Sequence, residues 1–153
     1  ITVLGRRQLQ RWLQLLVFAA GNPSGACNPL LLLAATRGRL MELLAAESQP
    51  GDTGFSDRAF MAGIMSLMPA LVGQPITEIV TPLGLTADVR DALCEGSGAI
   101  GKLLRLAEYS ENGDISRLTA ALGEIPGLSP KALNRAQALA LHWSNSIGQD
   151  QPA

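Results

Sequence analysis

The chain has 153 residues, enough for one domain that buries well over half of the surface its unfolded form exposes. Charged residues make up 16% of it, against roughly 25% in an ordinary domain, and its mean hydropathy is +0.20, so we expect part of its apolar surface to contact another domain or a second copy. The net charge of −1 argues against electrostatic binding of nucleic acid, which needs a clear excess of Lys and Arg.

The apolar runs and the cysteines indicate a soluble, cytoplasmic protein. The longest apolar runs, residues 15–20 and 30–35, are far shorter than the roughly 18 to 20 residues that span a bilayer, so we expect no membrane segment. Cys27 and Cys94 are isolated, which favours a reducing compartment and two buried thiols. The chain opens with neither an initiator Met nor a signal pattern, and we expect it to be a piece of a longer protein.

Helical periodicity dominates the first half of the chain. Apolar residues recur at spacings of three and four over residues 9–20, and a Gly-Asn-Pro run ends that segment. A second helix is predicted from residue 29 to about residue 47, followed by a turn-rich stretch at 48–54. The third is predicted from about residue 56 to residue 72, and it must bend or end near Pro69.

The second half continues as helices, predicted over residues 76–80, 87–95, 99–111 and 115–122. In the last helix Ser129 and Pro130 form a good N-cap and N1 pair, and apolar residues then step by three and four to Ile147. Because no stretch alternates like a strand, we predict an all-α fold, a multi-helix bundle. The predicted core comprises Trp12, Leu16, Phe60, Ile64, Leu104 and Trp143.

The glycine-rich run GSGAIG, residues 96–101, matches the GxGxxG pattern of dinucleotide-binding turns. Such a turn needs a strand before it and a helix after it, so that the pyrophosphate meets the helix N-terminus. The preceding residues read as a helix instead. We therefore interpret the run as a joint between two helices.

The inventory of ligands disfavours metal and acid–base chemistry. His142 is the chain's one histidine, so no multi-histidine metal site can form within it. Asp88 and Asp91 share a predicted helix face without a third ligand, and we interpret them as a solvated face. Five arginines allow two interpretations: they gather into a basic patch that holds an anionic ligand, or they lie on solvated helix faces. These residues are Arg6, Arg7, Arg11, Arg37 and Arg39.

The run AFMAGIMSLM, residues 59–68, resembles the segment AFLAGLLHDIG of the HD superfamily of metal phosphohydrolases and of its HDOD relatives, which are bacterial signalling output domains. The metal-binding His–Asp pair of that segment falls on Ser66 and Leu67. Upstream, ATRGRLMELLA resembles the HDOD helix that carries WRHS: Arg37 matches its arginine, and its histidine falls on Gly38. The positions that match the first motif are Ala59, Phe60, Ala62, Gly63, Ile64 and Met65.

Two further stretches resemble the HDOD half of proteins that join an EAL domain to an HDOD domain. They are Leu4 and Gly5 followed by QLQRWLQLL, and GAIGKLLRLAEYSENGD at residues 98–114. The resemblance runs from Leu4 to Ile147. It implies a helical fold like that of HD-domain phosphodiesterases, truncated at its N-terminus: residues 1–148 would be the C-terminal portion of an HDOD-like domain and 149–153 a frayed tail. An EAL domain would lie upstream.

The resemblance also implies that the catalytic metal site is vestigial at Gly38, Ser66 and Leu67. A neutral hydroxyl is a poor ligand for a divalent metal, and glycine and leucine side chains supply none. We therefore expect no catalytic residue, no metal and no cofactor.

Three hypotheses follow. In the first, the chain is a non-catalytic signalling module linked to cyclic di-GMP, which contacts a partner domain or protein and forms a homodimer as a fragment. In the second, it is a sensor whose vestigial cleft, with Arg37 and Arg39, holds a small anion. The third, a residual metal-dependent phosphohydrolase, is disfavoured by the missing ligands.

Overall fold

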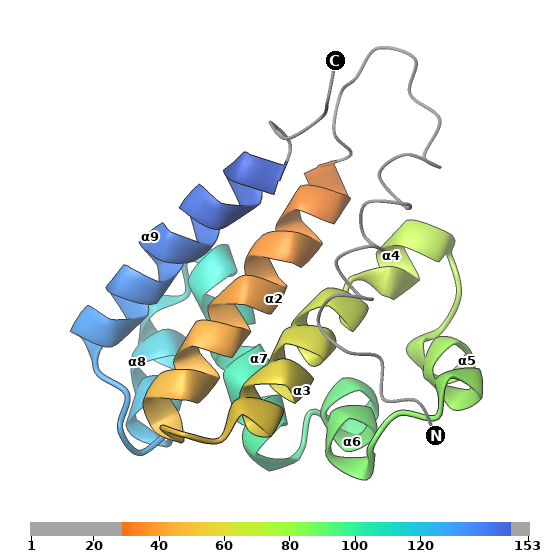
Figure 1. Cartoon of the computed structure of the whole chain (residues 1–153), viewed down its shortest axis with the longest axis horizontal. Coiled ribbons are helices and arrows are strands. Elements are labelled where there is room, and N and C mark those ends of the chain that lie inside the picture. The colour runs from red at the N-terminus through yellow and green to blue at the C-terminus, as the bar shows by residue number, and fades with distance from the viewer. Residues whose placement is uncertain (1–28, 148–153) are drawn as a thin grey trace.

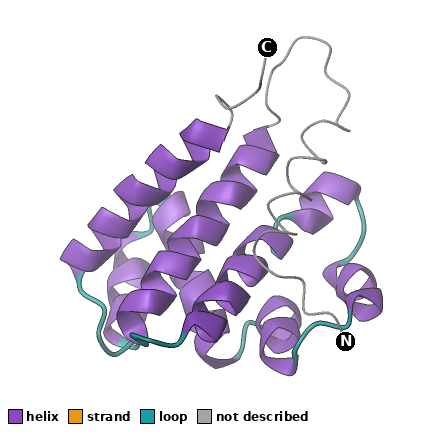
Figure 2. Ribbon diagram, in the orientation of Figure 1, coloured by secondary structure: helices purple, strands orange, loops and turns teal. Residues whose placement is uncertain are grey.

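The computed structural model describes residues 29–147, and these residues contain helices and no strand (Figure 2). The prediction of an all-α fold is confirmed for this part of the chain. The elements are α2 (Pro29–Ser48), α3 (Thr53–Met65), α4 (Met68–Val72), α5 (Ile76–Val80), the 3-10 turn η1 (Thr81–Leu83), α6 (Ala87–Glu95), α7 (Gly98–Asn112), α8 (Ile115–Gly123) and α9 (Pro130–Ile147).

Helix α2 is the centre of the bundle. It lies between α3 and α9, and α7 packs behind α2 and α3 (Figure 1). Helix α6 packs against α3 and α7, and α8 packs against α7. The two chain segments that the resemblance singled out, in α2 and α3, therefore lie side by side.

Helix α3 begins earlier than predicted because Asp52 caps it. The Asp52 carboxylate accepts a hydrogen bond from the backbone N–H of Phe55 at 2.9 Å, which satisfies a donor that the first turn leaves free. The sequence pattern placed the start at residue 56. The turn before α3 is correspondingly shorter than the predicted stretch of residues 48–54.

Two helices, α3 and α4, occupy the predicted stretch of residues 56–72, with Ser66 and Leu67 between them. The predicted bend or end near Pro69 is therefore confirmed, and it is an end of one helix and the start of another. Pro69 explains the break. A proline has no N–H to donate, and its ring clashes with the carbonyl four residues earlier, here that of Met65. Helix α3 ends at that residue, and Pro69 lies in the first turn of α4, where proline is tolerated.

Helices α2 and α3 cross in direct backbone contact at Gly38 and Gly63. A Cβ atom on Gly63 would lie 2.7 Å from the Cα atom of Gly38, and a Cβ atom on Gly38 would lie 2.7 Å from Cγ1 of Ile64. Only glycine fits at these two positions without a shift of the helices. The crossing brings Arg37 to the end of α3.

The core occupies the space between α2, α3, α7 and α9. Phe60, Ile64 and Leu104 are buried as predicted. Trp143 is only half-buried: its ring meets Phe60 edge-on, with 6.0 Å between the centroids, and its remaining surface faces outward. The core prediction is therefore wrong for Trp143. Two other predicted core residues, Trp12 and Leu16, lie outside the described residues.

The interpretation of GSGAIG as a helix joint is confirmed. Gly96 ends α6 with a φ of +65°, a backbone conformation that side chains with a Cβ rarely adopt, and α7 begins two residues later. A Cβ atom on Gly101 would lie 2.5 Å from the carbonyl of Gly96, so this glycine lets α7 close onto the joint.

Two remaining expectations concern the thiols and the membrane. Cys94 is exposed on α6, which corrects the prediction of a buried thiol, because its position turns away from α3 and α7; Cys27 lies outside the described residues. Among residues 29–147 no single helix has the length and hydropathy to cross a membrane. One pair bent by 118°, Thr53–Val72 with Ile76–Leu83, reaches those limits by length and composition only.

Candidate functional site

The bend between α3 and α4 holds the two positions where the resembled family carries its His–Asp pair. Ser66 and Leu67 are both half-buried there. The Ser66 hydroxyl donates a hydrogen bond to the carbonyl of Gly63 at 2.6 Å, which satisfies an acceptor left free at the end of α3. Neither side chain carries a charge.

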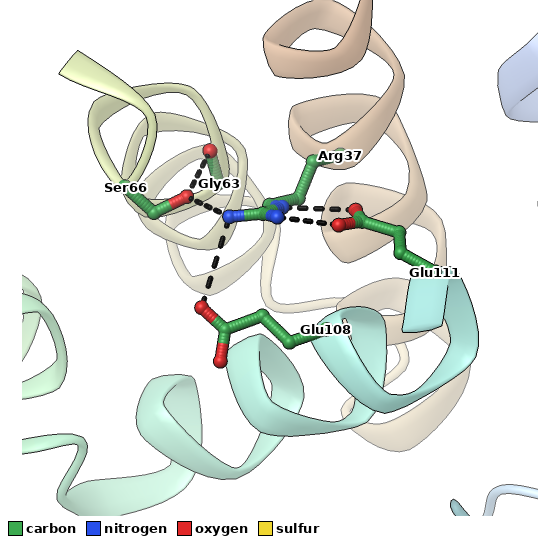
Figure 3. Close-up of polar contacts among 5 residues, drawn as sticks. All are labelled: Arg37, Gly63, Ser66, Glu108 and Glu111. Atoms are coloured by element: carbon green, nitrogen blue, oxygen red, sulfur yellow. Dashed lines mark hydrogen bonds and ion pairs between the residues drawn. The ribbon is translucent and has the colours of Figure 1, made fainter. Parts of the chain in front are cut away.

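Arg37 projects from α2 toward this bend, and its guanidinium lies between the bend and α7 (Figure 3). Its Nη1 donates to the Ser66 hydroxyl at 2.9 Å, and its Nε donates to one carboxylate oxygen of Glu111 at 2.9 Å. Its Nη2 pairs with the other oxygen of Glu111, so the contact is bidentate. Glu108 contributes a second carboxylate, 3.7 Å from Nη1.

This cluster, Arg37 with Ser66, Glu108 and Glu111, is called the Arg37 cluster below. Arg37 is only 7% exposed, and a buried guanidinium is stable only where hydrogen bonds and opposite charge replace its water. Glu108 and Glu111 stand three residues apart on α7, the spacing that places two side chains on one helix face. The cluster thus connects α2, α7 and the α3–α4 bend.

An anion that bound to Arg37 would have to displace Glu111 and would lie beside the carboxylate of Glu108. The guanidinium faces its own protein's carboxylates, so an added anion would compete with a bidentate, charge-assisted contact. Anion binding by Arg37 stays a prediction. It would require an anion that binds the guanidinium more strongly than Glu111 does.

Arg39 points away from the Arg37 cluster. Arg37 and Arg39 are two positions apart in the sequence, and such residues lie about 200° apart around the axis of an α-helix. The two arginines therefore face different neighbours. Arg39 pairs with Glu42 at 2.5 Å, and its guanidinium carbon lies 5.8 Å from the centroid of the Trp143 ring. The structure therefore does not gather these two arginines into one patch. Arg6, Arg7 and Arg11 lie outside the described residues.

The remaining predicted positions do not surround a metal. Gly38 faces the crossing with α3, where any side chain would meet Ile64. His142 is exposed on α9. Between residues 29 and 147 no group of three or more His, Cys, Asp or Glu side chains is placed to hold a metal ion.

Asp88 is exposed, as predicted for a solvated face, and it also forms an ion pair. Arg58 on α3 donates to it at 2.7 Å, which ties the start of α6 to α3. Burial by itself would raise the pKa of Asp88, but hydrogen bonds from Thr86, Arg58 and the Val89 N–H, together with the charge of Arg58, lower that pKa below its usual value.

Sequence reasoning missed Glu108 and Glu111. Their spacing of three residues, on a helix whose other face is apolar, is a local signal that they share a side of α7. That signal does not say which cation they face. The partner, Arg37, stands 74 residues before Glu111, and only the packing of α2 on α7 joins them.

No protein-family model matches the chain, and no solved structure does. The chain is similar to the cyclic di-GMP phosphodiesterase CdgJ of Vibrio cholerae serotype O1, with 28% identity over 149 residues. The aligned region covers 97% of this chain and 34% of that protein, so the chain spans about a third of the length of the curated relative that it matches.

Proposed function

We propose that this chain is a non-catalytic, HDOD-related module of a bacterial cyclic di-GMP signalling protein, and that it regulates by contact with a partner domain or protein in the cytoplasm. Two observations support the link to cyclic di-GMP. The first is the similarity to CdgJ over 97% of the chain. The second is the resemblance of residues 4–147 to the HDOD half of EAL–HDOD proteins. Phosphodiesterase activity of a longer protein would then belong to an EAL domain.

The observation that carries the non-catalytic part is the Arg37 cluster. At the bend where HD enzymes hold a divalent metal, this chain has a hydroxyl and a leucine, and a buried guanidinium donates to that hydroxyl at 2.9 Å. A guanidinium has no lone pair to offer a metal, and here it uses the Ser66 hydroxyl as its own hydrogen-bond acceptor. Glu111 neutralises the guanidinium by a bidentate contact and is thereby held away from metal binding.

The same contacts suit a regulatory scaffold. The cluster connects three parts of the bundle, α2, α7 and the α3–α4 bend, through charge-assisted hydrogen bonds. A rigid bundle of this kind can present a constant surface to a partner. The low share of charged residues, 16%, supports a partner-facing surface or a homodimer.

The test is a phosphodiesterase assay on the purified chain with cyclic di-GMP and Mn²⁺, combined with metal analysis. We expect no hydrolysis and no stoichiometric metal. Deleting residues 1–148 from the full-length protein should then change the activity or the regulation of that protein without removing its active site. Hydrolysis by the purified chain that chelation abolishes would contradict the proposal.

A small-anion sensor is the second candidate, and one observation favours it. The Nε of Arg39 is buried and has no hydrogen-bond partner among the described residues, so an anion that reached it would satisfy a donor that these residues leave unpaired. Calorimetry with inorganic phosphate tests this candidate. Binding that Arg39→Gln abolishes supports it, and equal binding by the Arg39→Gln variant contradicts it.

A further inference from the structure

A shallow hollow between α7 and α8, called the α7–α8 groove, is positively charged. Lys102, Arg105 and Tyr109 of α7 line one side, and Arg117 and Glu124 line the other. Its volume is about 140 Å³. Three cationic side chains and one carboxylate give its lining a net charge of +2, in a chain whose net charge is −1.

The cations of the α7–α8 groove are largely unneutralised. Lys102 and Arg105 are exposed, and neither forms an ion pair with any of residues 29–147. Arg117 contacts Asp114 at 3.5 Å and lies over the Tyr109 ring, 6.0 Å from its centroid. A position nine residues away on an α-helix lies about 180° around its axis, so Lys102 faces away from Glu111 and the Arg37 cluster.

A second, apolar hollow adjoins the α7–α8 groove and shares Lys102 and Glu124 with it. We call it the anchor hollow. Its walls include Phe55, Leu103 and Ile125, three buried core residues from α3, α7 and the α8–α9 loop. Its volume is about 360 Å³. The first turn of α7, the positive end of that helix dipole, also lines it.

We infer that the α7–α8 groove and the anchor hollow together bind an acidic segment of a partner protein, with one apolar side chain of that segment in the anchor hollow. The inference rests on the proposed function, because it names the chemistry of the partner. Opposite charge across an interface guides association and selects the partner. A buried apolar side chain in a pocket supplies most of the affinity of such contacts.

Size and shape favour a protein segment over a small molecule. Small-molecule sites are cavities of roughly 300 to 1,000 Å³ that bury about 70 to 90% of the ligand. The anchor hollow, at about 360 Å³, has a volume within that range but, like the groove, is open to solvent. The α7–α8 groove is smaller than that range and fits a carboxylate or two on the surface of a partner. Because Lys102 lines both hollows, the charged contact and the apolar anchor are adjacent.

The experiment uses the purified chain and three fluorescein-labelled helical peptides: one of Leu and Glu, its counterpart with Lys in place of Glu, and one of Ser and Glu. Fluorescence anisotropy should show the Leu/Glu peptide bound most tightly, and more weakly at high salt. Lys102→Glu with Arg105→Glu should weaken that binding at least about tenfold. Ala99→Trp, which fills the anchor hollow, should weaken it too.

The matched control is Lys131→Glu with Arg135→Glu, which makes the same charge change at exposed positions of α9 and should leave binding unchanged. Equal affinity for the Lys-containing peptide, or unchanged binding after the Lys102 and Arg105 reversals, overturns the inference. So does inorganic phosphate that binds in place of the peptide, which would identify a small-anion site. A dimer that the same reversals disperse would identify a second copy as the occupant and also overturn it.

These outcomes are independent of the phosphodiesterase assay. Hydrolysis by the purified chain would end the proposed non-catalytic role and leave the peptide result standing. A failed peptide titration would end the inference about the α7–α8 groove while the chain still lacked activity of its own.

Discussion

Arg37 is the residue on which the candidate site depends. Its guanidinium donates to the hydroxyl of Ser66 and binds the carboxylate of Glu111 in bidentate fashion. It also forms an ion pair with the carboxylate of Glu108. It is 7% exposed, so water replaces few of these contacts when one is lost. Removing a partner from a buried charge costs more than the charge pair itself contributes, because the remaining group is left without its counter-charge.

At this scale we predict that Arg37→Met lowers the free energy of unfolding by about 1 to 3 kcal/mol. This is less than the loss expected on breaking a fully buried ion pair, because the Glu111 side chain is 23% exposed. Urea unfolding followed by circular dichroism measures it. Arg105→Met is the control: Arg105 is exposed and has no ion pair within the described residues, so its change should stay within about 0.5 kcal/mol. Equal effects of the two substitutions would show that the Arg37 cluster adds no stability.

At the scale of the elements, the crossing of α2 and α3 decides where Arg37 lies. We predict that Gly63→Ala destabilises the chain, because the new Cβ atom would lie 2.7 Å from the Cα atom of Gly38 and backbone cannot yield as a flexible side chain does. Overpacking costs about 1 to 3 kcal/mol, and the better helix propensity of alanine returns up to about 1 kcal/mol of it.

Gly123→Ala is the matched control for that substitution. Gly123 ends α8 without a positive φ, and a Cβ atom there would meet nothing within 4 Å. Its replacement should be neutral or stabilising by up to about 1 kcal/mol. Urea unfolding of both variants provides the comparison, and a Gly63→Ala protein as stable as Gly123→Ala would mean that the two helices are further apart than described.

The contact between α3 and α6 should depend on pH through Asp88. Because the folded state lowers the pKa of Asp88, the contribution of this carboxylate is present above its unfolded pKa of about 3.9 and is lost as the pH falls through the folded pKa. We predict that Asp88→Asn is less stable than the parent chain at neutral pH and that the difference shrinks below about pH 4.

Thermal unfolding of both proteins across that pH range measures the effect. The effect should be small, since the Asp88 side chain is 43% exposed. Arg58→Met should reproduce most of it, and combining it with Asp88→Asn should add little. A difference that stays constant down to the lowest pH would contradict the role of the Asp88 carboxylate.

At the scale of the whole molecule, the composition predicts a homodimer of this chain. We expect apolar side chains of the first two predicted helices to form the contact, which Leu15→Glu or Leu31→Glu would disperse. Leu31 is 4% exposed within a single chain, so Leu31→Glu would disturb the fold and is the wrong substitution for this test. Leu15 lies outside the described residues.

Light scattering over a dilution series measures the association. We expect a dimer that dissociates on dilution, and a monomer near 16.1 kDa at high concentration would contradict the prediction. Leu15→Glu still tests the first predicted helix. Leu141→Glu tests α9, where the Leu141 side chain is 54% exposed and can be changed without opening the core.

The sequence by itself determined the features that depend on near neighbours in the chain. Helical spacing predicted the all-α class, and the Ser129 cap is confirmed by its bond to the N–H of Ala132 at 3.1 Å. The glycine joint at residues 96–101 was likewise readable. Proline chemistry predicted a bend or an end of the helix near Pro69, and α3 ends at Met65, four residues before that proline.

Only the tertiary structure decided which residues meet across the bundle. The pairing of Arg37 with Glu111 joins positions 74 residues apart, and no local pattern carries that information. The partial burial of Trp143 also depends on tertiary packing. Helical spacing places Trp143 on the apolar face of α9, but how far that face is buried depends on the helices that pack against it. Periodicity states which side of a helix is apolar, whereas the crossing at Gly38 and Gly63 sets which helix that side meets and how closely.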